Sequence, residues 1–262
     1  MNAELAGSVA VVTGGAKGIG RAIAVALAQE GADLILVGRD AAALEEAAAA
    51  IRGMGRRAFG LSADLIETAE VARISDLIKS EFDSRVDIMV TAAGTRELLN
   101  KPVAELDLEQ FNGVMQGNVN GTLLPIRAVL PFMQARRRGK IVAISGVFGL
   151  QGYAKHAGGC ASKWALEGLV RVLALELGAD NINVNAVCPG YVEGPRAEAG
   201  IKRAAQMRGV DAEAARAELQ QATALKRLST AEDVANAVLF LVSERSRNIT
   251  GRDLIVDAGW ML

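Results

Sequence analysis

The sequence predicts a single α/β domain built on a doubly wound sheet of seven parallel strands, with helices on both faces. Two observations predict this class. Short β-branched segments alternate with longer segments of helical period, and a glycine-rich turn directly follows the first β-branched segment. The chain of 262 residues is long enough to bury one large core without disulfides or metals. We therefore expect one domain over residues 1–262.

The expected strands are short, apolar and rich in β-branched residues, as strands buried on both faces are. In order they are Val9–Thr13, Leu34–Val37, Ala58–Leu61, Ile88–Thr91, Ile141–Ser145, Ile182–Val187 and Leu254–Val256. The segments between the early strands carry apolar residues at helical spacing, namely Ile19, Ile23 and Leu27, then Leu44, Ala47, Ala48 and Ile51, then Val71, Ile74, Ile78 and Phe82. Each apolar stripe is expected to cover the sheet.

The stretch from Glu193 to Lys226 departs from this rhythm, because it is polar and helical in composition and contains no strand. We predict a helical excursion around residues 193–226 that covers the substrate at the carboxyl ends of the strands. A solvated helical pair is the alternative. Arg196, Arg203 and Arg208 lie in this stretch; they could recognise a carboxylate or phosphate, or belong to a solvated helix face.

Composition narrows the possible partners to a small-molecule substrate. The 29 basic and 30 acidic residues give a net charge of −1, which argues against binding to nucleic acid or to a membrane surface. One histidine and two cysteines are too few for a zinc cage, so we expect no metal site. The sequence shows neither a signal peptide nor an apolar run of membrane-spanning length, and we expect a cytoplasmic protein with reduced thiols.

The glycine-rich turn is the strongest functional signal. It reads Thr13-Gly14-Gly15-Ala16-Lys17-Gly18-Ile19-Gly20 and leads directly into a helix. Glycines permit a tight turn and close approach of the backbone to a ligand, while the helix N-terminus offers unpaired N–H groups to a pyrophosphate. A glycine-rich turn between a strand and a helix at the start of a repeating βα chain predicts dinucleotide binding.

Cofactor preference is read at the end of the second strand, where the chain continues Val37-Gly38-Arg39-Asp40. An acid there favours NAD, whereas a basic residue favours the 2′-phosphate of NADP. Arg39 can clamp that phosphate and Lys17 can add a second charge. Asp40 is the competing NAD-type residue, but it directly precedes an alanine-rich helix and suits the N-cap. We predict NADP(H) as the preferred cofactor, with NAD(H) possible.

From the first strand to the C-terminus, the chain resembles the short-chain dehydrogenase/reductase family. The motifs that carry the resemblance are Thr13-Gly14-x-x-x-Gly18-x-Gly20, Ala63-Asp64-Leu65, Thr91-Ala92-Ala93-Gly94, Asn118-Val119-Asn120-Gly121, Pro189-Gly190-Tyr191-Val192 and the C-terminal Val256-Asp257-Ala258-Gly259. The resemblance implies a Rossmann-type fold and a homotetramer or homodimer. It implies that the cofactor is bound by Gly14, Lys17, Gly18, Ile19, Gly20, Arg39, Asp64, Leu65, Ala92, Gly94, Lys163, Pro189, Gly190 and Val192.

The active-site signature of that family, Tyr-x-x-x-Lys, is only half present. Lys163 matches the lysine and Asn118 the catalytic asparagine, but Gly159 stands four residues before Lys163, at the tyrosine position. The partner serine, thirteen residues before that tyrosine, falls on Gly146. In the family, a phenol with a lowered pKa supplies the proton that accompanies hydride transfer, and glycine supplies none.

Several groups could replace the missing tyrosine. Tyr153 brings a phenol to Lys163 if the loop folds back, although loop tyrosines commonly pack or contact substrate. His156 titrates near neutrality, and a surface loop residue is its alternative. Cys160 is better explained as a small buried residue, and strand alternation aims Ser145 at the opposite face. In a further interpretation, protons come from substrate or water, and Gly159 makes room for a bulkier substrate.

These residues predict an NADP(H)-dependent oxidoreductase with a non-standard active site, acting on a small organic carbonyl, alcohol or activated double bond. Candidate catalytic residues are Lys163, Asn118, Tyr153 and His156. Two alternatives remain open. One is an enzyme of the same fold with redox-neutral chemistry, such as elimination, bond cleavage or hydrolysis, and the other is a non-catalytic NADP(H)-binding regulator.

Overall fold

The computed structural model describes residues 4–95 and 101–262. These residues form one α/β domain around a seven-stranded sheet in the order β3-β2-β1-β4-β5-β6-β7, with every strand parallel to its neighbours. The strands are β1 (Val9–Thr13), β2 (Asp33–Gly38), β3 (Ala58–Ser62), β4 (Ile88–Thr91), β5 (Gly139–Ile144), β6 (Ile182–Pro189) and β7 (Asp253–Val256). The predicted sheet is therefore confirmed.

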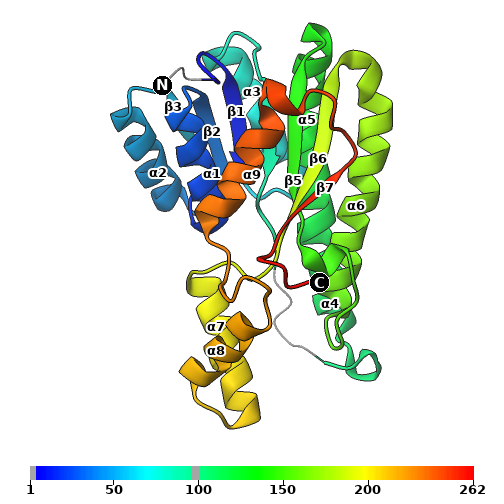
Figure 1. Cartoon of the computed structure of the whole chain (residues 1–262). Helices are drawn as coiled ribbons and strands as arrows, with labels where there is room; N and C mark the ends of the chain where they lie inside the picture. The colour runs from blue at the N-terminus through cyan, green and yellow to red at the C-terminus, as the bar shows by residue number, and fades with distance from the viewer. Residues whose placement is uncertain (1–3, 96–100) are drawn as a thin grey trace.

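Two layers of helices cover the sheet (Figure 1). The helices are α1 (Gly18–Gln29), α2 (Ala41–Gly53), α3 (Thr68–Glu81), α4 (Leu108–Met115), α5 (Gly121–Arg136), α6 (Ala157–Leu177), α7 (Pro195–Arg208), α8 (Ala212–Gln221) and α9 (Ala231–Val242). One core cluster joins α1, α2 and α9 to one face of the sheet, and a second joins α3, α5 and α6 to the other. The predicted stripes on α2 and α3 are buried in these clusters.

Parallel strands place all their carboxyl ends at one edge of the sheet, and the strand order makes that edge a binding site. From β1 the chain builds outward to β2 and β3, then returns to place β4 on the other side of β1. In open sheets with this order, the ligand-binding crevice lies at this point of reversal, at the carboxyl ends of β1 and β4. The glycine-rich turn follows β1 and opens α1, so the topology places it at this crevice.

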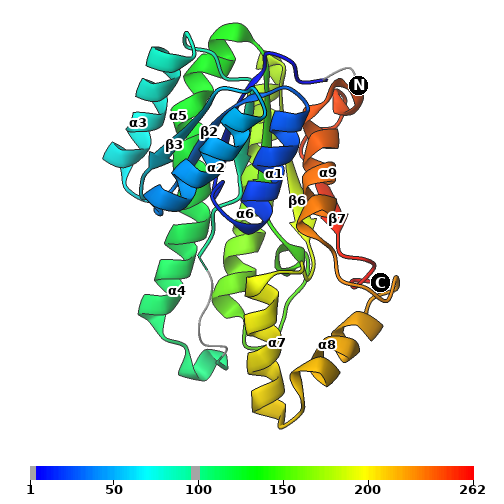
Figure 2. The same ribbon diagram turned by 90° about the vertical axis from the view of Figure 1, so that its left-hand side faces the viewer.

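The helical excursion forms within the expected range. Helices α7 and α8 stand below the carboxyl edge of the sheet in both views (Figures 1 and 2). They share a small apolar cluster that includes Ile201 and Ala215, separate from the two main core clusters. A parallel bridge between Val192 and Ser229 ties the base of the excursion together. The pair is thus a small subassembly at the site edge, and its role as a substrate cover remains a prediction.

Candidate functional site

The glycine-rich turn has a shape that only glycine permits. Gly14 and Gly18 have φ values of +68° and +54°, in the left-handed region. A Cβ on Gly20 would lie 2.2 Å from the carbonyl oxygen of Gly14, and one on Gly14 would lie 2.8 Å from the amide nitrogen of Ala93. No side chain caps the N-terminus of α1. The turn therefore leaves a backbone cradle at a helix N-terminus, which suits a dinucleotide pyrophosphate.

From the sequence we expect Lys17 and Arg39 to offer two positive charges to a 2′-phosphate, but in the structure Lys17 is paired with Asp40. Asp40 caps α2, as predicted, because its carboxylate accepts from the Ala43 amide at 3.1 Å. It also accepts from Lys17 Nζ at 2.6 Å, and this hydrogen bond holds the pKa of the Asp40 carboxyl below its usual value. The Lys17 charge is thus already engaged by a carboxylate. Arg39 is exposed and has no ion pair among the described residues.

The remaining expected cofactor residues line the same edge. Asp64 uses its carboxylate to accept from the Ile66 amide at 3.2 Å, which fixes the turn that buries Leu65. A Cβ on Gly94 would lie 3.0 Å from Asn118 Oδ1, and one on Gly190 would lie 2.7 Å from Asp257 Cβ. Close packing of loops explains these two glycines. Ala92 follows β4, Pro189 ends β6, and Val192 lies in the bridge at the base of the excursion.

Asn118 joins three segments beneath the site. It lies in a π-helical turn between α4 and α5, a distortion that often marks functional positions. Its Oδ1 accepts from the Thr95 amide at 2.8 Å, and its Nδ2 donates to Ser162 Oγ at 2.9 Å. Ser162 Oγ in turn donates to the carbonyl of Gly159 at 3.1 Å. Asn118 therefore fixes the N-terminal part of α6, and Lys163 projects from the second turn of this helix.

Lys163 is the titratable group whose environment best suits chemistry. Its Nζ donates to the carbonyl oxygen of Ile144, the last residue of β5, at 3.0 Å. Burial, and after it the positive charge of Arg196, lower the pKa of Lys163 to about 8. A lysine with this pKa can exchange a proton near neutral pH, which an ordinary surface lysine cannot do.

Tyr153 and His156 belong to an aromatic cluster at the same edge. The Tyr153 ring stacks on Trp260 with centroids 5.2 Å apart, and Phe148 packs against Tyr153 at 4.6 Å and His156 at 4.9 Å. Tyr191 meets the edge of Trp260 at 4.8 Å. The hydroxyl of Tyr153 accepts from Gln151, and burial raises the Tyr153 pKa. Its environment thus favours packing or substrate contact over an activated phenol.

A buried polar cluster below Lys163 could not be foreseen from the sequence. Glu167, one helical turn after Lys163, accepts from Cys188 Sγ at 3.4 Å and lies 3.8 Å from Arg171. Ser145 and Asp253 face the same carboxyl. Burial and the neighbouring Asp253 raise the pKa of Glu167 to about 7. The spacing of Glu167 from Lys163 was readable in the sequence, but its burial depends on β7.

Replacing Glu167 with glutamine should flatten the dependence of stability on pH. Unfolded glutamate releases its proton near pH 4.5, whereas folded Glu167 holds it to about pH 7, so the free energy of unfolding falls as pH rises through this window. Glutamine cannot ionise, so the variant does not lose free energy of unfolding in this pH range. We expect Glu167→Gln to raise the Tm by about 5 °C at pH 8 and by little at pH 5.

Thermal unfolding measured from pH 5 to pH 8.5 checks this expectation. Glu176→Gln is the matched control, because Glu176 is an exposed glutamate on the same helix. Parallel Tm curves for the wild type and Glu167→Gln would contradict the assigned environment of Glu167.

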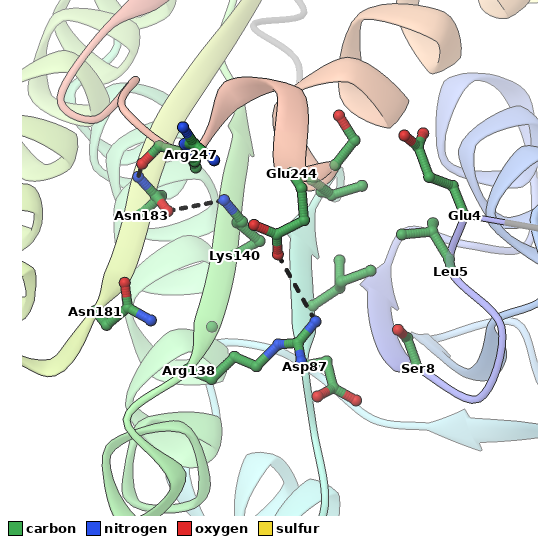
Figure 3. A pocket seen from close by; sticks show the side chains of 14 residues that line it. Glu4, Leu5, Ser8, Asp87, Arg138, Lys140, Asn181, Asn183, Glu244 and Arg247 are labelled. Carbon is green, nitrogen blue, oxygen red and sulfur yellow. Dashed lines mark hydrogen bonds and ion pairs between the residues drawn. The ribbon is translucent and has the colours of Figure 1, made fainter.

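A separate polar pocket lies at the opposite edge, around the amino ends of the strands (Figure 3). Several of its charged side chains have partners within the protein. Arg138 approaches Glu244 at 3.8 Å, and Lys140 Nζ donates to Asn183 Oδ1 at 2.9 Å. Asp87 pairs with Arg85 and Arg136. This pocket contains neither the glycine-rich turn nor Lys163, so the candidate site is the carboxyl edge.

Within residues 4–95 and 101–262, no cluster of histidine, cysteine and acidic side chains has the arrangement of a metal site. The helices over the same residues include none with the length and apolar character needed to span a membrane.

The cradle, the crevice and the lysine at the carboxyl edge define a dinucleotide-binding oxidoreductase of the doubly wound α/β class. Comparison with known proteins gives the family. The sequence profile described as "Enoyl-(Acyl carrier protein) reductase" matches residues 14–261. The chain belongs to the short-chain dehydrogenase/reductase family, and the predicted resemblance is confirmed.

Curated relatives match the whole chain. Cis-4-hydroxycyclohexanecarboxylate dehydrogenase of Sinomonas cyclohexanicum is 34% identical over 260 residues, which cover 99% of each protein. D-threitol dehydrogenase of Mycolicibacterium smegmatis is 34% identical over 259 residues, covering 99% of this chain and 95% of the relative. Among solved structures, NAD+-bound xylitol dehydrogenase superposes with a TM-score of 0.92 at 28% identity, covering 97% of this chain and 99% of the other.

Proposed function

We propose that this protein is an NADP(H)-dependent oxidoreductase that interconverts a small organic alcohol and its carbonyl compound, with Lys163 transferring the proton. The observation that carries the proposal is the position of the partly buried Lys163 at the carboxyl end of β5, where its Nζ donates to the carbonyl of Ile144 and its pKa is about 8. The names of the relatives, which include dehydrogenases of a hydroxy acid and of a polyol, support the choice of alcohol and carbonyl.

The residues present fit a nicotinamide dinucleotide. The backbone of Gly14, Gly18 and Gly20 would hold the pyrophosphate, because added side chains there meet backbone atoms or need an unfavourable φ. Arg39 would hold the 2′-phosphate, and Lys163 the nicotinamide ribose. When bound, the cofactor supplies or accepts the hydride. Every other element of the chemistry must come from the chain or from substrate.

Lys163 supplies the proton chemistry in this proposal. In the oxidation direction its neutral amine takes the hydroxyl proton of the alcohol, and in reduction its ammonium donates that proton to the carbonyl oxygen. A phenol at position 159 is absent, so the lysine acts directly or through one water. Asn118 positions it by fixing Ser162 and the first turn of α6.

The test is cofactor reduction with a panel of alcohols. NADP+ is incubated with the protein and cis-4-hydroxycyclohexanecarboxylate, D-threitol or xylitol, and the reduced nicotinamide is followed by its absorbance. We expect turnover with at least one member. Tight NADP+ binding without turnover across an extended panel would contradict the proposal and favour redox-neutral chemistry or a regulatory role.

The preference for NADP(H) predicts a selective effect at Arg39. Its guanidinium is exposed and has no ion pair among the described residues, whereas Lys17 is engaged by Asp40. Loss of a charge-assisted phosphate contact weakens binding by roughly 10- to 100-fold. We expect Arg39→Ala to weaken NADPH binding by that factor and NADH binding by less than about twofold. Fluorescence titration measures both affinities.

Arg21→Ala provides the control for Arg39→Ala, because Arg21 lies on α1 near the cradle but pairs with Glu46 at 3.1 Å. It should leave both affinities unchanged. Equal weakening of NADPH and NADH by Arg39→Ala would overturn the cofactor assignment.

We also propose a homotetramer or homodimer built on the long helices and the last strand. Exposed apolar side chains on α6 support this proposal: Trp164, Val172 and Leu175 are 51%, 50% and 85% exposed. On β7, Ile255 is 46% exposed. Light scattering after size exclusion gives the assembly mass directly, and a monomer at micromolar concentration would contradict this expectation.

A further inference from the structure

We propose that Arg196 binds a carboxylate of the substrate, so that the protein acts on a small acid with an apolar body; this inference rests on the proposed oxidoreductase function. Arg196 is the second residue of α7. Only residues 190–194 separate α7 from the end of β6 at the carboxyl edge of the sheet. The position of α7 below that edge is visible in both views (Figures 1 and 2). Arg196 therefore enters the site region from the excursion.

The charge of Arg196 is available to a ligand. In the described part of the chain, no carboxylate lies within ion-pair distance of its guanidinium. The two acids nearest to it in the sequence, Glu193 and Glu198, are both held by Arg216 of α8, with the Glu193 contact at 3.2 Å. Because Arg216 of α8 pairs with both carboxylates, neither of them neutralises the charge of Arg196.

The structure also distinguishes Arg196 from Arg203 and Arg208, which the sequence alone could not do, because the three arginines differ in their partners. Arg208 lies at the far end of α7 and pairs with Glu218 at 2.7 Å. Arg203 has an interaction of its own. Arg196 is the arginine of α7 at the end nearest the site, and no acid of the described residues engages it.

Arg196 and Lys163 lie at the same edge of the sheet, because Lys163 Nζ donates to the carbonyl of Ile144 at the end of β5 and α7 begins six residues after the end of β6, the neighbouring strand. The charge of Arg196 is close enough to contribute to the lowered pKa of Lys163, second only to burial among the causes. Two cations at one edge repel each other, and an anion bound there would relieve that repulsion. A guanidinium suits a planar carboxylate, because it can donate two parallel hydrogen bonds.

Aromatic rings nearby would accommodate the apolar body of such an acid. Tyr191 lies in the loop that leads from β6 to α7, and its ring meets Trp260, which stacks on Tyr153. Phe148 packs against both Tyr153 and His156, the residue directly before α6, which brings the rings beside the first turn of α6. An acid held at Arg196 therefore has apolar surface within reach, which a polyol would not use.

The experiment compares an acid with its uncharged isostere. Cyclohexanecarboxylate and cyclohexanecarboxamide are titrated calorimetrically into the protein, with and without saturating NADP+. We expect the wild type to bind the carboxylate at least about tenfold more tightly than the amide. Arg196→Gln should remove that preference, and Arg196→Lys should restore part of it. Arg208→Gln, on the same helix, should change neither affinity.

Other outcomes would overturn the assignment. Equal affinity for acid and amide, or no binding of the acid, would show that Arg196 recognises no carboxylate. A loss of NADP+ affinity in Arg196→Gln equal to its loss of carboxylate affinity would make Arg196 a cofactor contact. Because binding is measured without turnover, failure of the proposed redox activity would leave this readout intact and the two failures distinguishable.

Discussion

Replacing Lys163 with methionine is expected to lower kcat by at least about a hundredfold, because the variant lacks the group that we propose to transfer the proton. Methionine keeps the length and apolar stem of lysine, so packing against β5 is largely preserved. Only the ammonium, and with it the hydrogen bond to the carbonyl of Ile144, disappears. Steady-state kinetics with the alcohol found in the panel measures this effect, and circular dichroism confirms that the variant is folded.

The pH profile separates a proton-transferring Lys163 from one that only positions the cofactor. Alcohol oxidation needs the neutral amine, so its kcat should rise with pH through about 8; carbonyl reduction needs the ammonium and should fall through the same value. Lys163→Arg keeps a positive charge that cannot be titrated. If Lys163→Arg recovers wild-type kcat, Lys163 acts by charge alone and the proposed role is wrong.

A matched control guards against a general effect of losing a lysine. Lys79 is an exposed lysine on α3 and pairs with Asp76 at 3.7 Å. Lys79→Met should leave kcat and its pH dependence unchanged. An equal loss in both variants would point to assembly or stability and not to the active site.

The elements of the fold were predictable because their signals are local. Strand β1 is an unbroken apolar run because helices cover both faces of it, and Leu44 and Ile51 mark a buried stripe that a helix period alone reveals. The predicted strand 141–145 shows where this reasoning is less accurate: β5 begins at Gly139 and ends at Ile144. Ladder pairing with β6, which sets those ends, joins residues far apart in the sequence.

The candidate site was only partly predictable for the same reason. The glycine-rich turn is a short motif, and so is the spacing of Lys163 from Gly159, which occupies the tyrosine position. Both could therefore be recognised directly in the sequence. The ion pair of Lys17 with Asp40 joins residues that are 23 positions apart in the sequence, and the ion pair of Arg216 with Glu193 has the same separation. Such contacts decide which charges remain for a ligand, and they exist only once the chain has folded.

Replacing Gly159 with tyrosine restores the Tyr-x-x-x-Lys motif of the family, and we expect it to lower activity on the native substrate. Residue 159 lies in the first turn of α6, one turn before Lys163, so the phenol would fill the space beside Lys163 Nζ. If that space holds substrate, the added ring excludes it. We expect kcat/KM to fall by at least about tenfold, in the range of a steric block in a well-packed site.

A rise in kcat/KM for Gly159→Tyr would mean that glycine at position 159 reflects the loss of a catalytic tyrosine and not an adaptation to the substrate. A site that had merely lost its acid would gain turnover from Gly159→Tyr, and more from the double variant with Gly146→Ser. Gly53→Tyr is the control, because Gly53 is an exposed position at the end of α2 with open space around it, and the same ring there should leave kinetics unchanged. NADP+ affinity should stay near wild type in all three variants, since the cradle glycines lie in the β1–α1 turn. A fall in kcat/KM with cofactor affinity intact would therefore locate the effect in the substrate space beside Lys163.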